Sequence, residues 1–288
     1  MPLLFVVLWS TGFIGAKLGT PYAPPMTLLA LRFGLVAVCL MGWMIVTGAP
    51  WPTARQWWEQ AVIATFVHVI YLGGVFVAVD LGLEAGATAV VLGLQPLAIA
   101  FGAAAMLGER LNRVQWIGMA LGLAGVALVV GRKLDAGIGG PASLAFALMA
   151  LAAISLGTIL QKRRSEDTPM LTGNMVQFTW AAILSFAAAL VFEEVSIHWT
   201  PVFIFALGWM VIVLSLGALT LYYILIKRGA ASEVASLFFL VPASTAVIAW
   251  PLFGEVMGLI EIAGMVAAMV GVLLVLRPGL ISRSKATG

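Results

Sequence analysis

The chain of 288 residues is 62% hydrophobic and only 9% charged, whereas a soluble domain carries about 25% charged residues. Together with a mean hydropathy of +1.11, this composition excludes a water-soluble globular protein and indicates an integral membrane protein. The formal net charge of +3 is spread over many apolar segments, so we expect no basic face for nucleic acid. The single Cys39 excludes an intrachain disulfide.

Ten segments are apolar and long enough to cross a lipid bilayer, for which about 20 residues are required. The first segment lacks the basic region and the cleavage site of a signal peptide, so we expect it to stay as a helix. The links between segments are short and leave no room for a soluble domain. The sequence therefore predicts an all-α integral membrane protein with ten transmembrane helices, at residues 2–19, 25–47, 57–80, 85–107, 113–131, 140–160, 171–192, 202–226, 231–253 and 259–276.

Basic residues mark one side of this ten-helix arrangement. Eleven lie on that side, three (Lys17, Arg132 and Lys133) lie on the other, and Arg32 lies within a span. Because Lys and Arg stay on the cytoplasmic side of a membrane, we expect a multi-pass protein of the cell membrane with both termini in the cytoplasm. The eleven are Arg55, Arg110, Arg113, Lys162, Arg163, Arg164, Lys227, Arg228, Arg277, Arg283 and Lys285.

The sequence contains an internal repeat. The stretch PLAIAFGAAAMLGE, residues 96–109, returns as PASTAVIAWPLFGE, residues 242–255, with the same spacing from Pro to Gly-Glu. A shift of 146 positions gives fourteen identities between residues 84 and 130, and a shift of 145 extends the match upstream. We expect two five-helix units, residues 1–137 and 138–288, in one membrane domain. Because five is odd, the second unit is inverted, as in many secondary transporters; a duplication kept for stability alone is the alternative.

Two stretches carry a resemblance to a known family. WSTGFIGAKLGTPYAPPMTLLALRFGL, residues 9–35, and GERLNRVQWIGMALGLAGVALVV, residues 108–130, resemble the two ends of an EamA unit of the drug/metabolite transporter superfamily. The resemblance implies a ten-helix carrier that exports amino acids, related metabolites or drugs through a central cavity lined mainly by the first helices of each half. The second unit has Gln177 where Arg32 stands in the first, so we expect the two halves to contact substrate unequally.

His68 and Tyr71 are the leading candidates for substrate contacts. His68 is the twelfth residue of its expected span, and an ionisable group near the membrane midplane is expected to face a bundle interior or a wet cavity. Tyr71 follows three residues later, on nearly the same helical face. The alternative is that His68 bonds to a backbone carbonyl and only joins two helices.

Arg32 and Gln95 are further candidates for substrate binding. Arg32 lies about 10 Å deep in the second span, where it meets a substrate carboxylate, snorkels outward or pairs with helix ends. Gln95 stands directly before Pro96, which removes a backbone donor and interrupts the helix where it lines a cavity or is buried. Polar bonding between helices is the alternative for Gln95.

Four more polar or aromatic residues complete the expected binding set. Trp9 and Ser10 lie halfway along the first helix, where ligand contact and structural packing are equally open. Asn174 and Gln177 lie three residues apart near the cytoplasmic end of their span. They either serve an inner gate or join helices by hydrogen bonds, as polar residues in membrane helices do.

The repeated phrase is interpreted as a hinge and turn of the scaffold. Each proline marks a weak point in its span, and each Gly-Glu ends the span. The glycine is expected in a left-handed terminal conformation, and the glutamate favours the positive end of the following helix. Inversion places Glu109 at the cytoplasmic face and Glu255 at the outer face, where Lys17 is interpreted as an anchor. The hinge and turn residues are Pro96, Gly108, Glu109, Pro242, Gly254 and Glu255.

Small residues in spans five and ten have a different role. They allow helices to approach closely and are interpreted as packing elements of the two units, while a homodimer contact is left open. The residues are Gly118, Gly122, Gly125, Gly264, Ala268 and Gly271.

The chain shows no catalytic or metal-binding motif, so we expect no enzyme activity, no cofactor and no metal site. No carboxylate falls in the middle of an expected span, which weakens the case for tight ion coupling. The sequence predicts a secondary transporter that exports small metabolites, such as amino acids, by alternating access, with the lipid bilayer and a small-molecule substrate as partners. An uncoupled facilitator or a drug efflux protein is the alternative; a channel or an intramembrane enzyme is less favoured.

Overall fold

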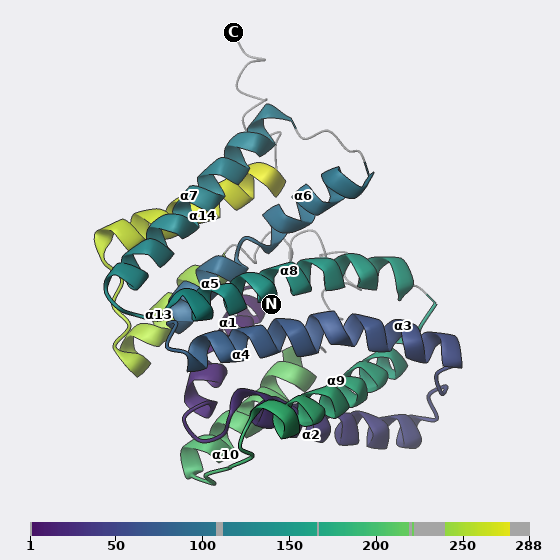
Figure 1. Ribbon diagram of the computed structural model, residues 1–288. Helices are drawn as coiled ribbons and strands as arrows, with labels where there is room; N and C mark the ends of the chain where they lie inside the picture. Colours follow the sequence, from purple (N-terminus) through teal and green to yellow (C-terminus); the bar gives the residue numbers. More distant parts are fainter. Residues whose placement is uncertain (1, 108–111, 166, 219–220, 222–239, 277–288) are drawn as a thin grey trace.

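The computed structural model describes residues 2–107, 112–165, 167–218, 221 and 240–276, and this part of the chain is helical without strands (Figure 1). Two segments, η1 and η2, are π-helical and continue α3 and α10. The elements are α1 (Pro2–Gly19), α2 (Pro25–Thr47), α3 (Ala54–Ala64), η1 (Thr65–Ile70), α4 (Tyr71–Asp80), α5 (Ala85–Leu92), α6 (Gln95–Leu107), α7 (Arg113–Asp135), α8 (Pro141–Arg164), α9 (Met170–Phe192), α10 (Pro201–Gly208), η2 (Trp209–Ala218), α13 (Val241–Phe253) and α14 (Leu259–Leu276).

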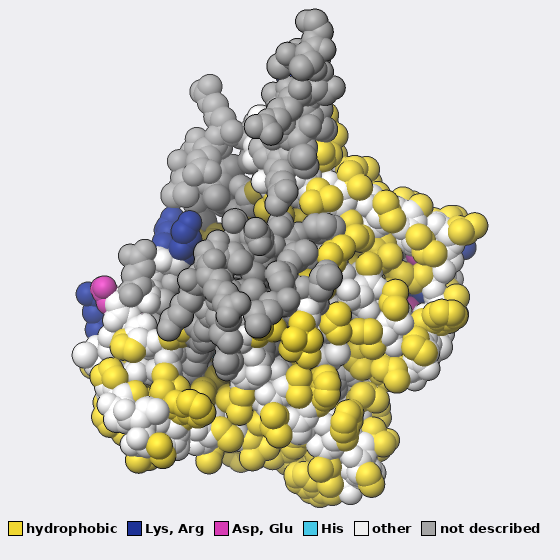
Figure 2. Space-filling view, turned by 180° about the vertical axis from the view of Figure 1, so that it is seen from behind, with side chains coloured by type: hydrophobic (Ala, Val, Ile, Leu, Met, Phe, Trp, Pro, Cys, Tyr) yellow, Lys and Arg dark blue, Asp and Glu magenta, His cyan; other side chains and the backbone are white. Residues whose placement is uncertain are grey.

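The helices are built to lie in a membrane. Within the described residues, 7 helical segments are long and apolar enough to cross a bilayer, and shorter apolar helices occupy Val6–Gly19, Pro201–Gly217 and Val241–Phe253. Hydrophobic side chains cover most of the described surface on the face shown in Figure 2, and charged side chains are few. In water such a surface would be costly, whereas lipid tails solvate it. The chain is a multi-pass membrane protein that is helical in its described part.

Local sequence signals set the helix ends. Thr53 caps α3, where its hydroxyl accepts from the backbone N–H of Gln56 and the Gln56 side chain accepts from the Thr53 N–H. Asn112 and Gln115 form the same reciprocal arrangement at the start of α7. Such capping boxes satisfy N–H groups that have no partner inside the helix. They fix the points at which the chain enters α3 and α7.

Helices α7 and α14 pack along each other through the expected stripe of small residues (Figure 1). A Cβ atom added to Gly125 would lie 2.4 Å from the carbonyl oxygen of Gly264, and one added to Gly118 would lie 2.7 Å from that of Gly271. Because real Cβ atoms do not approach backbone this closely, the packing requires glycine at these positions. The interpretation of this stripe as a packing element is confirmed.

The π-helical segment η1 changes the register between His68 and Tyr71. His68 lies inside η1, and Tyr71 begins α4 directly after it. A π-helical turn contains more residues than the 3.6 of an α-helix, so a spacing of three residues no longer places both side chains on one face. The two residues therefore join different clusters.

Candidate functional site

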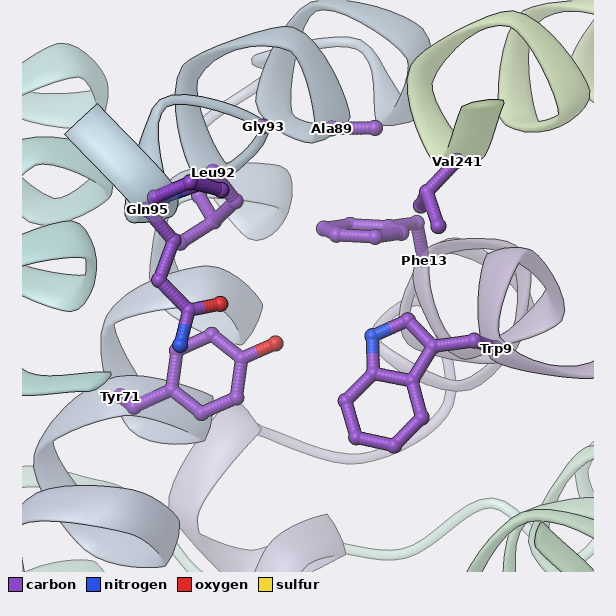
Figure 3. Close-up of a pocket in the computed structure, with 9 residues that line it drawn as sticks. Trp9, Phe13, Tyr71, Ala89, Leu92, Gly93, Gln95 and Val241 are labelled. Atoms are coloured by element: carbon purple, nitrogen blue, oxygen red, sulfur yellow. The ribbon is translucent and has the colours of Figure 1, made fainter. Parts of the chain in front are cut away.

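A small pocket lies where α1, α4, α5, α6 and the start of α13 meet (Figure 3). The indole of Trp9 and the phenol of Tyr71 point toward each other across it, and the side chain of Gln95 descends toward Tyr71. Its volume is about 20 Å³, which is room for one water molecule. We call it the central pocket; it is lined by Trp9, Phe13, Tyr71, Ala89, Leu92, Gly93, Gln95, Pro96 and Val241.

One wall of the central pocket is a break between two helices. Helix α5 ends at Leu92 and α6 begins at Gln95, next to Pro96, which has no N–H to continue the ladder. A Cβ atom on Gly93 would lie 2.9 Å from Cγ of Pro242, so only glycine lets the start of α13 approach the break. The Gln95 amide donates to Thr158 Oγ1 on α8 at 3.1 Å. Both repeated prolines thus lie at or against this wall.

A chain of hydrogen bonds ties η1 to α9 and α3. Nε2 of His68 lies 3.2 Å from Oε1 of Gln177, whose amide donates to Oε1 of Gln60 at 2.6 Å. The amide of Gln60 donates in turn to Ser165 Oγ at 3.0 Å. Gln177 thus uses both ends of its amide to join helices. Sequence reasoning missed Gln60, although a buried glutamine in an apolar helix is itself a signal.

His68 is held by two phenylalanine rings. Its ring centre lies 5.6 Å from that of Phe33 on α2 and 4.7 Å from that of Phe178 on α9. Its Nδ1 is buried and has no hydrogen-bond partner in the described part of the chain. His68 is not among the residues that line the central pocket, and among the described residues its ring contacts the side chains of Gln177, Phe33 and Phe178 rather than a backbone carbonyl.

Arg32 lies on α2 next to this aromatic cluster. Its side chain is buried, and Nε donates to Ser215 Oγ of η2 at 3.2 Å. The guanidinium carbon lies 5.8 Å from the ring centre of Phe33. Arg32 is also an electrostatic neighbour of Tyr71 and His68. Arg32 therefore lies beside the His68 cluster and interacts electrostatically with Tyr71 of the central pocket.

The remaining expected residues have structural contacts or lie away from the pocket. The buried hydroxyl of Ser10 donates to the carbonyl of Val6 at 2.8 Å and lies 3.3 Å from that of Val241, so it joins α1 to α13. Asn174 is half-buried on α9 and is not among the residues that line the central pocket. Of the expected binding set, Trp9, Tyr71 and Gln95 share the pocket.

An ion pair that sequence reasoning did not predict joins the end of α1 to the segment after α13. Nζ of Lys17, at the end of α1, lies 2.5 Å from Oε1 of Glu255, which follows α13. The Glu255 carboxylate also accepts the N–H groups of Ala85 and Gly86, at 3.0 Å and 3.1 Å. We call these four residues the Lys17 latch. Lys17 lies one helical turn beyond Phe13 of the central pocket, so the latch lies close to one side of the pocket.

Glu255 differs from its expected place. The sequence assigned it to the positive end of the helix that follows it, but its carboxylate caps the N-terminus of α5, which belongs to the other half of the sequence. A glutamate at the positive end of a helix is the expected interaction. The helix involved is α5 rather than the next helix in the chain, because tertiary packing brings α5 to Glu255. Gly254 before it has the left-handed φ of +68° and its N–H donates to Trp250 at 2.9 Å. Gly108 and Glu109 lie outside the described residues.

Other charges at this end of the bundle are also paired. Lys133 lies 2.8 Å from Glu84 and 3.3 Å from Glu261. Glu193 accepts from the N–H groups of Met26 and Thr27 at the start of α2, at 2.7 Å and 2.9 Å. A second hollow, of about 600 Å³, opens beside the latch; Lys17, Tyr22, Asp80 and Phe253 are among its lining residues. Among the described residues, no group of three or more His, Cys, Asp or Glu is placed to hold a metal ion.

These features define a multi-pass helical membrane protein with a small pocket of aromatic and polar side chains where its helices meet. The EamA-like transporter family matches residues 1–131 and again residues 142–277. The chain belongs to the EamA-like transporter family.

Similar proteins carry the names of transporters. The "Uncharacterized transporter YvbV" of Bacillus subtilis is 27% identical, over 94% of this chain and 88% of that protein. The "Probable amino-acid metabolite efflux pump" of Escherichia coli is 28% identical, over 94% of this chain and 92% of that protein. A solved crystal structure, 21% identical, matches with a TM-score of 0.66 over 99% of this chain and 97% of that one, and shares the fold.

Proposed function

We propose that the protein is a secondary transporter that exports small metabolites, such as amino acids or related compounds, by alternating access through the central pocket. The observation that carries the proposal is a small pocket, lined by residues of both halves of the sequence, with an ion pair between those halves about one helical turn away. A pocket of about 20 Å³ is too small for an amino acid, so substrate enters after the helices around it separate. The name of the Escherichia coli relative supports this substrate class.

We further propose ten transmembrane helices in two inverted five-helix units, residues 1–137 and 138–288. The two family matches, 1–131 and 142–277, support this division. Helices that the repeat relates begin at corresponding residues: α2 at Pro25 and α9 at Met170, α7 at Arg113 and α14 at Leu259. Each related pair also packs together. Fusion of a cytoplasm-active fluorescent reporter to each terminus tests the orientation, and fluorescence from both fusions is expected.

In this mechanism, the Lys17 latch holds the outer side closed. It joins α1 and α5 of the first unit to Glu255 of the second, so the outer side opens only when these contacts break. The break at Gly93–Leu94, against which Pro242 packs, provides the hinge at the pocket wall. Gly108 and Glu109 are proposed to mark a turn on the inner side, equivalent to Gly254 and Glu255 on the outer side.

The pocket residues have separate roles in the proposal. Trp9, Tyr71 and Gln95 contact the substrate, because their side chains face the same space (Figure 3). His68 and Gln177 hold η1 against α9 through their mutual contact. Ser10 supports the α13 side of the pocket through its bond to Val241, and Asn174 contacts substrate only nearer the inner side. We propose no cofactor and no catalytic step.

Growth in the presence of toxic amino-acid analogues tests the proposed function. Cells that overproduce the protein are expected to tolerate higher concentrations of exported analogues and to hold less labelled analogue inside. A Trp9→Ala, Tyr71→Ala double variant, expressed to the same membrane level, is expected to lose this resistance. Equal sensitivity of producing and non-producing cells across the analogue panel would contradict export of this substrate class.

A further inference from the structure

We infer that the transported substrate carries a carboxylate group and that Arg32 receives it beside the central pocket. The inference rests on the proposed transport function and specifies the chemical class of its substrate. It rests on two comparisons within the described residues. One is between Arg32 and the paired cations Lys17 and Lys133, and the other is between Arg32 and Gln177, its equivalent in the second half.

Arg32 is a buried cation without an anion among the described residues. Its relative exposure is 7%, and the ion pairs of the described part of the chain do not include it. Two other cations have carboxylate partners: the half-buried Lys17 pairs with Glu255, and the buried Lys133 pairs with Glu84 and Glu261. A buried charge requires such compensation. The protein provides carboxylate partners for both lysines. For Arg32 the described residues provide only an uncharged partner, the Ser215 hydroxyl.

The equivalent position in the second half shows what a structural residue does there. The repeat relates Arg32 on α2 to Gln177 on α9. Gln177 is uncharged, and its amide makes bonds at both ends, with Gln60 and His68. A neutral side chain therefore suffices to join helices at this place in the fold. The positive charge of Arg32 is not needed to join helices, so we assign it to a bound anion.

The position of Arg32 is better suited to binding a ligand between the helices than to reaching the lipid headgroups. Its Nε donates to Ser215 on a neighbouring helical segment, so the side chain lies between helices and does not extend to the lipid headgroups. The ring of Phe33, the next residue, lies 5.6 Å from that of His68, and Arg32 is an electrostatic neighbour of Tyr71 and His68. Tyr71 in turn lines the central pocket opposite Trp9 (Figure 3).

If Arg32 binds the carboxylate of a substrate, the rest of that substrate lies against aromatic side chains. Guanidinium and carboxylate groups form two parallel hydrogen bonds, which Arg32 can offer from donors other than Nε. Trp9, Phe13 and Tyr71 then provide an apolar and aromatic wall for the substrate body. The substrate class is thus a small carboxylic acid with an apolar or aromatic side group.

The experiment compares Arg32→Gln and Arg32→Lys with the unchanged protein and with Arg55→Gln, a control at an exposed arginine. Purified full-length protein is heated in detergent with sodium benzoate or with sodium chloride at equal ionic strength. Benzoate is expected to raise the midpoint of unfolding of the unchanged protein and of Arg55→Gln, and not that of Arg32→Gln. Without benzoate, Arg32→Gln is expected to be at least as stable as the unchanged protein, because a buried uncompensated charge is removed.

A second arm measures exchange in liposomes with L-phenylalanine, L-phenylalaninamide and phenethylamine. The acid is expected to exchange, and both compounds without a carboxylate are expected to exchange more than about tenfold more slowly. Arg32→Gln is expected to lose this preference, and Arg32→Lys to keep part of it because the charge remains.

Each contrary result has a distinct meaning. Equal exchange of the acid and the amide by the unchanged protein would overturn the carboxylate inference and leave the transport function standing. An equal effect of benzoate on the unchanged protein and on Arg32→Gln, or a large loss of stability in ligand-free Arg32→Gln, would also overturn it. Absence of exchange of all three compounds, with a benzoate effect that depends on Arg32, would support the anion site and count against export of amino acids.

Discussion

Replacing Lys17 with glutamine removes the cation of the Lys17 latch and leaves Glu255 without its charged partner. The Glu255 side chain is 4% exposed and that of Lys17 is 31% exposed. Removing one partner of a fully buried pair costs about 3–5 kcal/mol; because water reaches Lys17, we expect about 1–2 kcal/mol here. The loss falls on the closed arrangement alone, so the population with an open outer side is expected to rise about 5- to 30-fold.

Chemical labelling of the central pocket measures this population. In a Cys39→Ser background, which removes the exposed native thiol, Ala89→Cys places a new thiol on the pocket wall. A maleimide that does not cross membranes is added to right-side-out vesicles. Because the thiol is reached only when the outer side opens, Lys17→Gln is expected to raise the labelling rate about 5- to 30-fold.

The pair of Arg55, which is 81% exposed, and Glu59, 2.8 Å apart on one helix, provides the matched control. Arg55→Gln also removes a cation from an ion pair, but this pair lies within α3, joins no other helix and contributes little because Arg55 is in water. No change in labelling is therefore expected. If Lys17→Gln labels no faster than this control, the ion pair does not hold the outer side closed and the reasoning fails.

Three further predictions concern packing, the hinge and energy coupling. Gly125→Val, whose side chain would meet the backbone of Gly264, is expected to cost about 1–3 kcal/mol and to lower the midpoint of thermal unfolding, whereas Gly131→Ala, which has nothing within 4 Å of an added Cβ, is expected to leave it unchanged; equal midpoints would contradict tight α7–α14 packing. Gly93→Ala is expected to push Pro242 from the pocket wall and to slow exchange in liposomes at normal membrane levels, and an unchanged exchange rate would remove the hinge from the mechanism. Exchange is expected to proceed at the same rate with and without a pH gradient, and a gradient-driven accumulation of substrate would show proton coupling.

The sequence predicted the helical segments well because membrane helices are long runs of apolar residues. Helices α2, α7 and α9 begin within a residue of their expected positions, at Pro25, Arg113 and Met170. The small residues of α7 and α14 were also assigned correctly, since glycine at regular helical spacing has few uses other than close packing.

The site was harder to predict because it depends on long-range contacts. Lys17 and Glu255 are 238 residues apart and join α1 to the far end of α13, and at span ends each is easily read as an anchor or a cap. His68 and Tyr71 were assigned to one face by α-helical periodicity, but η1 rotates them apart. No apolar pattern distinguishes a π-helical turn from an α-helical one, so this change of register appears only in the structure.

Counterflow in liposomes tests the central claim most directly. Purified protein is placed in liposomes loaded with unlabelled L-phenylalanine or another amino acid of the panel, and uptake of the labelled compound is followed with increasing external concentration. A transporter that works by alternating access through the central pocket is expected to give saturable uptake that internal substrate accelerates, and Trp9→Ala is expected to weaken it. Uptake that rises in proportion to concentration and ignores internal substrate would contradict the account and indicate a channel.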